Sequence, residues 1–174
     1  LSLIPPISTH GRLGAQVVNN FSLNMLGGYT GGTKGVEIGG LFNIDKKDVQ
    51  FFQAAGIFNV VGGKMKGVQV GGINNTVLDS VKGFQAAGIN NLVKGNFSGM
   101  QVGGIYNHVT DSVKGIQVGG IANFARKKVG GVQIGGIMNF SNKETAGVQV
   151  AGIINYSKKL KGLQIGLINI SDTS

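Results

Sequence analysis

The chain has 174 residues, of which 32 are glycine and only two are proline, and its formal net charge at pH 7 is +9. Glycine does not recur at every third residue, which excludes a collagen triple helix, and the high apolar content argues against intrinsic disorder. Cysteine is absent and no apolar run reaches the roughly 18 residues of a membrane-spanning helix, so disulfide frameworks, thiolate metal sites and helical membrane spans are excluded.

Residues 1–34 are predicted to form lead-in strands. Phe21, Leu23 and Met25 alternate with Ser22 and Asn24, and a period of two is typical of a strand with two unlike faces. The glycine-rich stretch 27–34 is interpreted as a turn between strands. It does not match a phosphate-binding loop, because the required Gly-Lys-Ser/Thr ending is missing.

From residue 35 onward a unit of 16 residues recurs without a gap, with the pattern Gly-Val-Gln-Val-Gly-Gly-Ile-x-Asn at its start. Tandem units of this size indicate a repeat architecture, so residues 35–174 are predicted to be one structural domain or a fragment of a larger one. The eight full units begin at Gly35, Phe51, Gly67, Gly83, Gly99, Gly115, Gly131 and Gly147, and a shortened ninth begins at Gly162.

Three positions of the unit are nearly invariant and form columns that we predict to be structural. Their amides are expected to hydrogen-bond to neighbouring strands or to ordered water; the alternative is a polar lumen for sugars or other solutes. Position three holds Gln53, Gln69, Gln85, Gln101, Gln117, Gln133 and Gln149, with Glu37 in the first unit. Position six holds Gly40, Gly56, Gly72, Gly88, Gly104, Gly120, Gly136 and Gly152, and position nine holds Asn43, Asn59, Asn75, Asn91, Asn107, Asn123, Asn139 and Asn155.

Apolar residues alternate with small or amide residues inside each unit, which predicts an all-β fold. Two arrangements fit this alternation. In an antiparallel meander each unit is one strand and a tight turn, which gives about ten strands; in a parallel solenoid each unit is one turn of the coil and identical residues stack.

The charged segments between motifs favour the meander. Segments after the odd units balance five acidic residues with five lysines, whereas those after the even units carry only basic residues. In a meander, odd and even turns lie at opposite ends of the sheet, so one end is neutral and the other forms a basic rim. In a solenoid the alternation would be only a relic of pairwise duplication. The rim residues are Lys64, Lys66, Lys94, Arg126, Lys127, Lys128, Lys158, Lys159 and Lys161.

The length of the predicted strands, about 10–12 residues, matches a tilted membrane-spanning β-strand, and their interiors are almost free of charge. The main prediction is therefore an antiparallel meander that forms all or part of an outer-membrane-type β-barrel. Asn74, Asn90 and His108 argue against it, because they fall in the apolar register where contact with lipid is costly. A parallel β-solenoid with 16-residue turns remains the alternative.

Units such as Gly-Val-Gln-Ile-Gly-Gly-Ile-Met-Asn at 131–139 and the closing Gly-Leu-Gln-Ile-Gly-Leu-Ile-Asn at 162–169 resemble a family of bacterial surface repeats associated with Gram-negative outer membranes. The resemblance covers about residues 35–174. It implies a location in the outer membrane or at the cell surface and a β structure, and it brings no activity or catalytic residues.

No catalytic, cofactor-binding or metal-binding residues are predicted. His10 and His108 lie in unrelated contexts, and His108 with Asp111 and Ser112 is interpreted as a variable strand end rather than a hydrolase triad. The expected function is a structural or pore-like role with no enzymatic activity, in which the basic rim contacts anionic lipid or lipopolysaccharide. The alternative is a secreted or surface solenoid that acts as an adhesive or scaffold module. Nucleic acid is not expected as a partner, because only Phe97 is aromatic within the basic segments.

Overall fold

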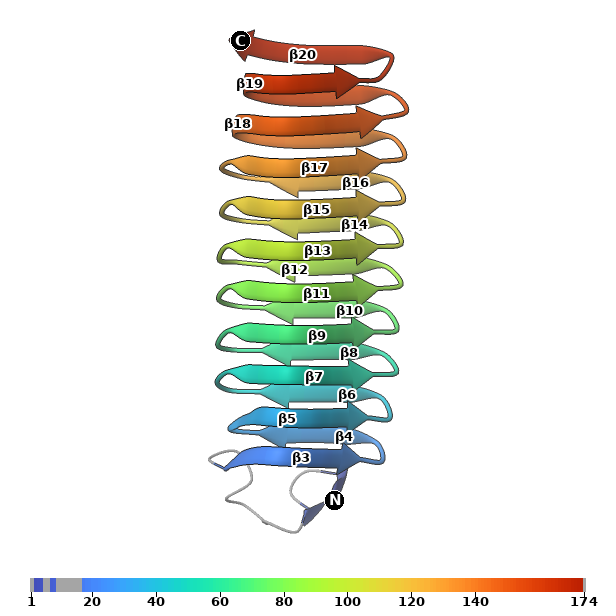
Figure 1. Cartoon of the computed structure of the whole chain (residues 1–174). Helices are drawn as coiled ribbons and strands as arrows, with labels where there is room; N and C mark the ends of the chain where they lie inside the picture. The colour runs from blue at the N-terminus through green and yellow to red at the C-terminus, as the bar shows by residue number, and fades with distance from the viewer. Residues whose placement is uncertain (1, 5–6, 9–16, 174) are drawn as a thin grey trace.

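The structure, a computed structural model, describes residues 2–4, 7–8 and 17–173, and in these residues the chain coils into a parallel β-solenoid of about ten turns (Figure 1). Each turn contributes a long strand to one face and a short strand to the opposite face. None of the described residues form a helix, so no helix is long and apolar enough to cross a membrane.

The short elements β1 (Ser2–Ile4) and β2 (Ile7–Ser8) precede the first turn. The long strands are β3 (Val18–Asn24), β5 (Gly32–Gly39), β7 (Val49–Ala55), β9 (Met65–Gly71), β11 (Val81–Ala87), β13 (Phe97–Gly103), β15 (Val113–Gly119) and β17 (Val129–Gly135). The short strands are β4 (Gly27–Thr30), β6 (Phe42–Asp45), β8 (Phe58–Val61), β10 (Asn74–Val77), β12 (Asn90–Val93), β14 (Tyr106–Val109) and β16 (Ala122–Ala125). In β18 (Met138–Ala151) and β19 (Ile154–Ile165) a short strand runs on into the next long strand, and β20 (Ile168–Thr173) ends the coil.

From β3 onward neighbouring strands are parallel, and between β5 and β17 residues 16 positions apart lie side by side. Gln101 pairs with Gln117 between β13 and β15, and Asn91 pairs with Asn107 between β12 and β14. The predicted antiparallel meander and barrel are therefore wrong, and the alternative, a parallel β-solenoid with 16-residue turns, is confirmed. The expected single strand per unit is also wrong, because the chain turns a corner at Gly-Gly-Ile or Ala-Gly-Ile and forms a second strand.

The solenoid begins before the first recognisable unit. Strand β3 pairs with β5 and β4 pairs with β6, so residues from Val18 onward already form a turn of the coil. The glycine-rich stretch 27–34 lies in β4 and β5 for most of its length, and only residue 31 separates the two strands. The predicted turn between strands is therefore confined to residue 31, and its extension over the whole stretch is wrong.

The interior is narrow and is filled by inward-facing side chains from both faces. The glutamines of position three and the asparagines of position nine are completely buried in every turn from 53 to 155. Beside them runs an apolar strip formed by Val49, Val61, Met65, Val77, Val81, Val93, Phe97, Val109, Val113, Ala125 and Val129. The inward positions become polar at both ends of this strip, with Asp45 and Thr33 at one end and Ser141 and Thr145 at the other.

Glycine at position six is required by the close approach of neighbouring turns. A Cβ atom on Gly104 would lie 1.9 Å from the carbonyl oxygen of Gly88, and on Gly120 it would lie 2.0 Å from that of Gly104. Such contacts are far inside van der Waals distance, and the atoms in conflict belong to backbone that is fixed in the sheet. This column therefore sets the corner at which each turn stacks on the last.

Position one of the unit favours glycine for a different reason, its backbone conformation, and Phe51 is the one residue of another type in this column. From Gly67 onward the glycines of this column have positive φ values, for example 132° at Gly99, and Phe51 adopts a φ of 88°. The pairing of β5 with β7 skips residues 50 and 51, so the sheet opens locally where the phenylalanine stands. Its side chain is 69% exposed and contributes little packing.

We expect Phe51→Gly to raise the free energy of unfolding by about 1 kcal/mol, because it removes a strained positive φ and loses little buried surface. Gly99→Phe is the matched control at the same position of a turn whose pairing is continuous on both sides, and it should be strongly destabilising. Chemical denaturation of the three proteins measures both changes. Destabilisation by Phe51→Gly would contradict this account of the corner.

Candidate functional site

The two amide columns form continuous hydrogen-bonded ladders that run in opposite directions. In the glutamine ladder each Nε2 donates to the Oε1 of the preceding turn, as from Gln117 to Gln101 at 2.8 Å. In the asparagine ladder each Nδ2 donates to the Oδ1 of the following turn, as from Asn107 to Asn123 at 2.9 Å. The asparagine also donates to a backbone carbonyl of the next long strand; for Asn107 this is Val118, at 2.7 Å. These bonds satisfy the buried amides, as burial demands.

This geometry decides between the two predictions made for the amide columns. Their side chains are buried and bonded to one another, so they do not line a lumen through which a polar solute could pass. Among the buried side-chain polar atoms of the described residues, only the Thr145 hydroxyl oxygen lacks a hydrogen-bond partner. The columns therefore hold turns together.

The glutamine ladder starts at a pair of buried acidic residues. All its donors point toward the first turns, so the first glutamine, Gln53, needs an acceptor there. Its Nε2 donates to Glu37 Oε2 at 2.9 Å and also to Asp45. Thr30 and Thr33 donate their hydroxyls to Asp45, and Asn24 donates its amide to Glu37.

Two carboxyl groups that share one buried donor cannot both ionise without a large desolvation cost. Burial raises the pKa of Glu37 to about 9, and the neighbouring Asp45 adds to the rise, while the hydrogen bond from Gln53 opposes it. Burial also raises the pKa of Asp45, against the hydrogen bonds that it accepts. At neutral pH the pair therefore holds a proton. This cluster was not predicted from the sequence, although Glu37 is the one departure from glutamine in its column.

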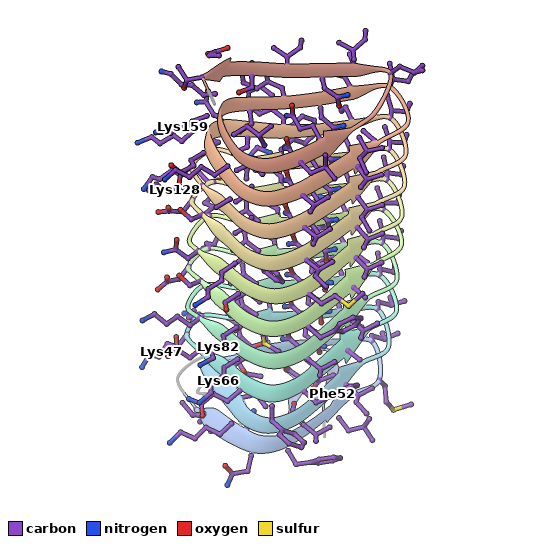
Figure 2. All side chains as sticks on the ribbon, turned by 45° about the horizontal axis from the view of Figure 1, so that its top comes forward. Lys47, Phe52, Lys66, Lys82, Lys128 and Lys159 are labelled. Atoms are coloured by element: carbon purple, nitrogen blue, oxygen red, sulfur yellow. The ribbon has the colours of Figure 1, made fainter. Side chains whose placement is uncertain are left out.

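The basic side chains gather on one flank of the solenoid. The name basic flank is used here for the turns that join each short strand from β6 onward to the next long strand, together with the first outward position of that long strand. Figure 2 shows Lys47, Lys66, Lys82, Lys128 and Lys159 along this side. The predicted division into a neutral end and a basic end is wrong, because in a parallel coil all the turns between units lie on the same flank.

The 32-residue charge alternation instead places acidic and basic turns next to one another. Asp111 forms an ion pair with Lys127 in the following turn, and 2.8 Å separate Asp111 Oδ2 from Lys127 Nζ. Glu144 lies between two basic turns, 3.9 Å from Lys128 Nζ and 3.4 Å from Lys161 Nζ. These pairs are partly exposed and individually weak, but they lower the repulsion between stacked lysines.

The basic flank remains strongly positive after this pairing. It carries fourteen basic residues against four acidic ones, Asp48, Asp79, Asp111 and Glu144, since Asp45 faces the interior. The nine predicted rim residues all belong to it: Lys64, Lys66, Lys94, Arg126, Lys127, Lys128, Lys158, Lys159 and Lys161. The other five are Lys46, Lys47, Lys82, Lys114 and Lys143. Phosphate groups are the natural counter-ions of such a surface.

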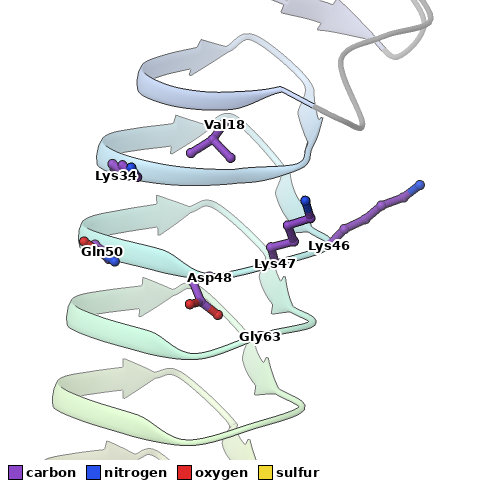
Figure 3. A pocket seen from close by; sticks show the side chains of 7 residues that line it. All are labelled: Val18, Lys34, Lys46, Lys47, Asp48, Gln50 and Gly63. Atoms are coloured by element: carbon purple, nitrogen blue, oxygen red, sulfur yellow. The ribbon is translucent and has the colours of Figure 1, made fainter.

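A cavity of about 430 Å³ lies at the first turns, between Val18, Lys34, Lys46, Lys47, Asp48, Gln50 and Gly63. Figure 3 shows Lys34 and Gln50 on the opposite side of the view from Lys46 and Lys47, so these side chains do not converge on one point. Lys46 lies over the ring of Tyr29, 5.3 Å from its centroid, and Asp48 accepts a hydrogen bond from the backbone of Lys64. The cavity is a groove at the basic flank, and we assign no separate function to it.

His108 belongs to an outward row of aromatic side chains. Its ring centroid lies 6.1 Å from that of Phe124, which is followed by Phe140 at 6.4 Å and Tyr156 at 4.9 Å. Ser112 donates its hydroxyl to Asp111 at 3.2 Å. Burial and the nearby Arg126 lower the pKa of His108. The row fits the interpretation of His108 as a variable strand residue; His10 lies outside the described residues.

The acid pair makes stability depend on pH with a definite sign. Since the folded-state pKa of Glu37 lies above its ordinary value of 4.5, its contribution to stability is present below about pH 4.5 and is lost as pH rises toward 9. Glu37→Gln continues the glutamine ladder without a carboxyl. It should match wild-type stability near pH 4 and exceed it near pH 8 by several kcal/mol, since each pH unit between the two pKa values contributes about 1.4 kcal/mol. Denaturant unfolding at both pH values is the measurement. Asp111→Asn, which changes a surface acid, serves as the control; an equal gain in that variant, or none in Glu37→Gln, would contradict the account.

Comparison with protein-family models, with curated proteins and with solved structures returned no match. Function is therefore inferred from the amide ladders, the buried acid pair and the basic flank.

Proposed function

We propose that this chain is a non-enzymatic structural module of the bacterial cell surface, a rigid β-solenoid scaffold that holds anionic lipid or lipopolysaccharide against its basic flank. The observation that carries the proposal is the basic flank itself. Eight successive turns place basic side chains on one side of a coil that is internally cross-bonded at every turn.

Two features support a scaffold role. The ladders bond each turn to the next along the whole length, so the coil is expected to resist bending and to present its flank as a straight row. The polar side chains of the interior are occupied in holding turns together. A pore-like role was expected from the predicted barrel. It has lost that support, because the chain is a solenoid whose amide columns do not line a lumen.

The location at the cell surface is supported by the repeat units, which resemble those of outer-membrane-associated surface repeats. Lipid phosphates and the phosphates of lipopolysaccharide share the chemistry that such a flank attracts, and nearby lysines each contribute about 1 kcal/mol to attraction by an anionic surface. An adhesive role at the same surface would use the same rigid coil.

We expect the protein to sediment with vesicles that contain phosphatidylglycerol and not with purely zwitterionic vesicles, and we expect the binding to weaken as salt is added. The triple variant Lys94→Gln, Lys158→Gln, Lys159→Gln should lose at least about tenfold in affinity. Replacement of the same three lysines by arginine keeps the charge and is the matched control. Competition by purified lipopolysaccharide would identify it as a ligand of the same flank.

Failure to bind anionic vesicles or lipopolysaccharide would overturn the proposed function. So would an affinity of the glutamine variant equal to that of the arginine variant.

A further inference from the structure

The outer face of the long strands is entirely apolar at two positions in every turn. We call this surface the apolar wall. Position two contributes Val36, Phe52, Val68, Phe84, Met100, Ile116, Val132, Val148 and Leu163. Position four contributes Ile38, Ala54, Val70, Ala86, Val102, Val118, Ile134, Val150 and Ile165. All these side chains are half-buried or exposed, with 40% of Met100 and 42% of Ile134 in contact with solvent.

A continuous apolar surface of this extent is unusual on a monomeric soluble protein and indicates a site of interaction. The wall continues around the corner of the coil, where the position-seven residues Leu41, Ile57, Ile73, Ile89, Ile105, Ile121, Ile137 and Ile153 are each about two-fifths exposed. The outer face of the short strands differs, because Asn74, Thr76, Asn90 and His108 interrupt its apolar residues. The wall is therefore the uninterrupted apolar face of the coil, whereas the short-strand face mixes outward aromatic residues such as Phe124 and Phe140 with polar ones.

The opposite margin of the apolar wall carries lysines. Two residues before position two, the long strands present Lys34, Lys66, Lys82, Lys114 and Lys161 outward, and all five are exposed. Figure 2 shows Lys66 and Lys82 among the lysines of the basic flank, with Phe52 away from them. Long lysine side chains at the border of an apolar surface can reach the level of lipid phosphates.

The backbone of this face is already satisfied. The long strands between β5 and β18 pair in parallel register with a neighbour on each side, apart from the gap between β5 and β7 at residues 50 and 51, so the unpaired edges of the sheet lie at the ends of the coil. A surface without free N–H or C=O groups can enter an apolar medium without losing hydrogen bonds to water.

Two occupants could cover such a wall, a second copy of the chain or a bilayer. A second copy would bury the apolar residues but would bring another molecule with a net charge of +9 against the lysine margin. An anionic bilayer complements both features at once, hydrocarbon for the wall and phosphate for the lysines. Charge complementarity thus favours the bilayer.

We infer that the apolar wall lies against the boundary between headgroups and acyl chains of an anionic phospholipid bilayer, with the lysine margin at the phosphates and the axis of the coil parallel to the membrane. This inference rests on the proposed function and assigns the surface and the depth of contact.

The absence of cysteine allows single labels to be placed at will. Met100→Cys and Ile134→Cys place an environment-sensitive NBD dye on the wall, and Thr76→Cys places it on the opposite face. With vesicles that contain phosphatidylglycerol, the two wall labels should shift to shorter emission wavelengths and be quenched by acyl-chain spin labels. The Thr76 label should show neither change. The unlabelled pair Val118→Glu, Ile134→Glu should lose vesicle binding in salt at which the wild type and Thr76→Glu still bind; circular dichroism checks that all variants fold.

Salt-sensitive binding without a blue shift of the wall labels would overturn the inference and leave the proposed function standing. Absence of binding to anionic vesicles and to lipopolysaccharide would overturn both. A blue shift of the wall labels that rises with protein concentration in the absence of vesicles would identify a second copy as the occupant and would also overturn the inference.

Discussion

Each residue stacks directly beside its equivalent in the next turn, and the packing of the interior, the corners and the flank all follow from this register. In this register a buried glutamine meets a glutamine and a buried asparagine meets an asparagine, so each side-chain amide finds in the neighbouring turn the donor or acceptor that it requires. The same register forces glycine at the corners, where a Cβ atom would strike the backbone of the preceding turn. Loss of register by one residue would disrupt all these columns together.

A repeated register also creates problems at the ends and on the surface, where identical groups would face one another. At the first turns, the donors of the glutamine ladder meet Glu37 and Asp45, which supply acceptors at the cost of holding a proton. On the flank, stacked lysines would repel, and the alternation of acidic and basic turns places Asp111 and Glu144 between them. The 32-residue period thus has an electrostatic consequence in a parallel coil.

The sequence was sufficient to predict the strands, the alternation of faces and the invariant columns, because these follow from a period of two inside a period of 16. It was not sufficient to predict the direction of the strands. The charge alternation is compatible with both an antiparallel meander and a parallel solenoid, and it was interpreted as evidence for the meander. The corner within each unit was also missed, since Gly-Gly-Ile interrupts the alternation only briefly. The acid pair could have been found only by asking why Glu37 replaces glutamine and Asp45 replaces the valine of later turns such as Val61 and Val77.

Disulfide formation between outward positions tests whether the turns stack in parallel register. Met100 and Ile116 are paired residues of adjacent long strands, and both are about two-fifths exposed. The account predicts that Met100→Cys, Ile116→Cys forms an intramolecular disulfide rapidly under mild oxidation. Ser98→Cys, Phe124→Cys, which joins two half-exposed residues that would be opposite in an antiparallel meander, should not form a disulfide. Rapid bond formation in the second pair and not in the first would contradict the solenoid.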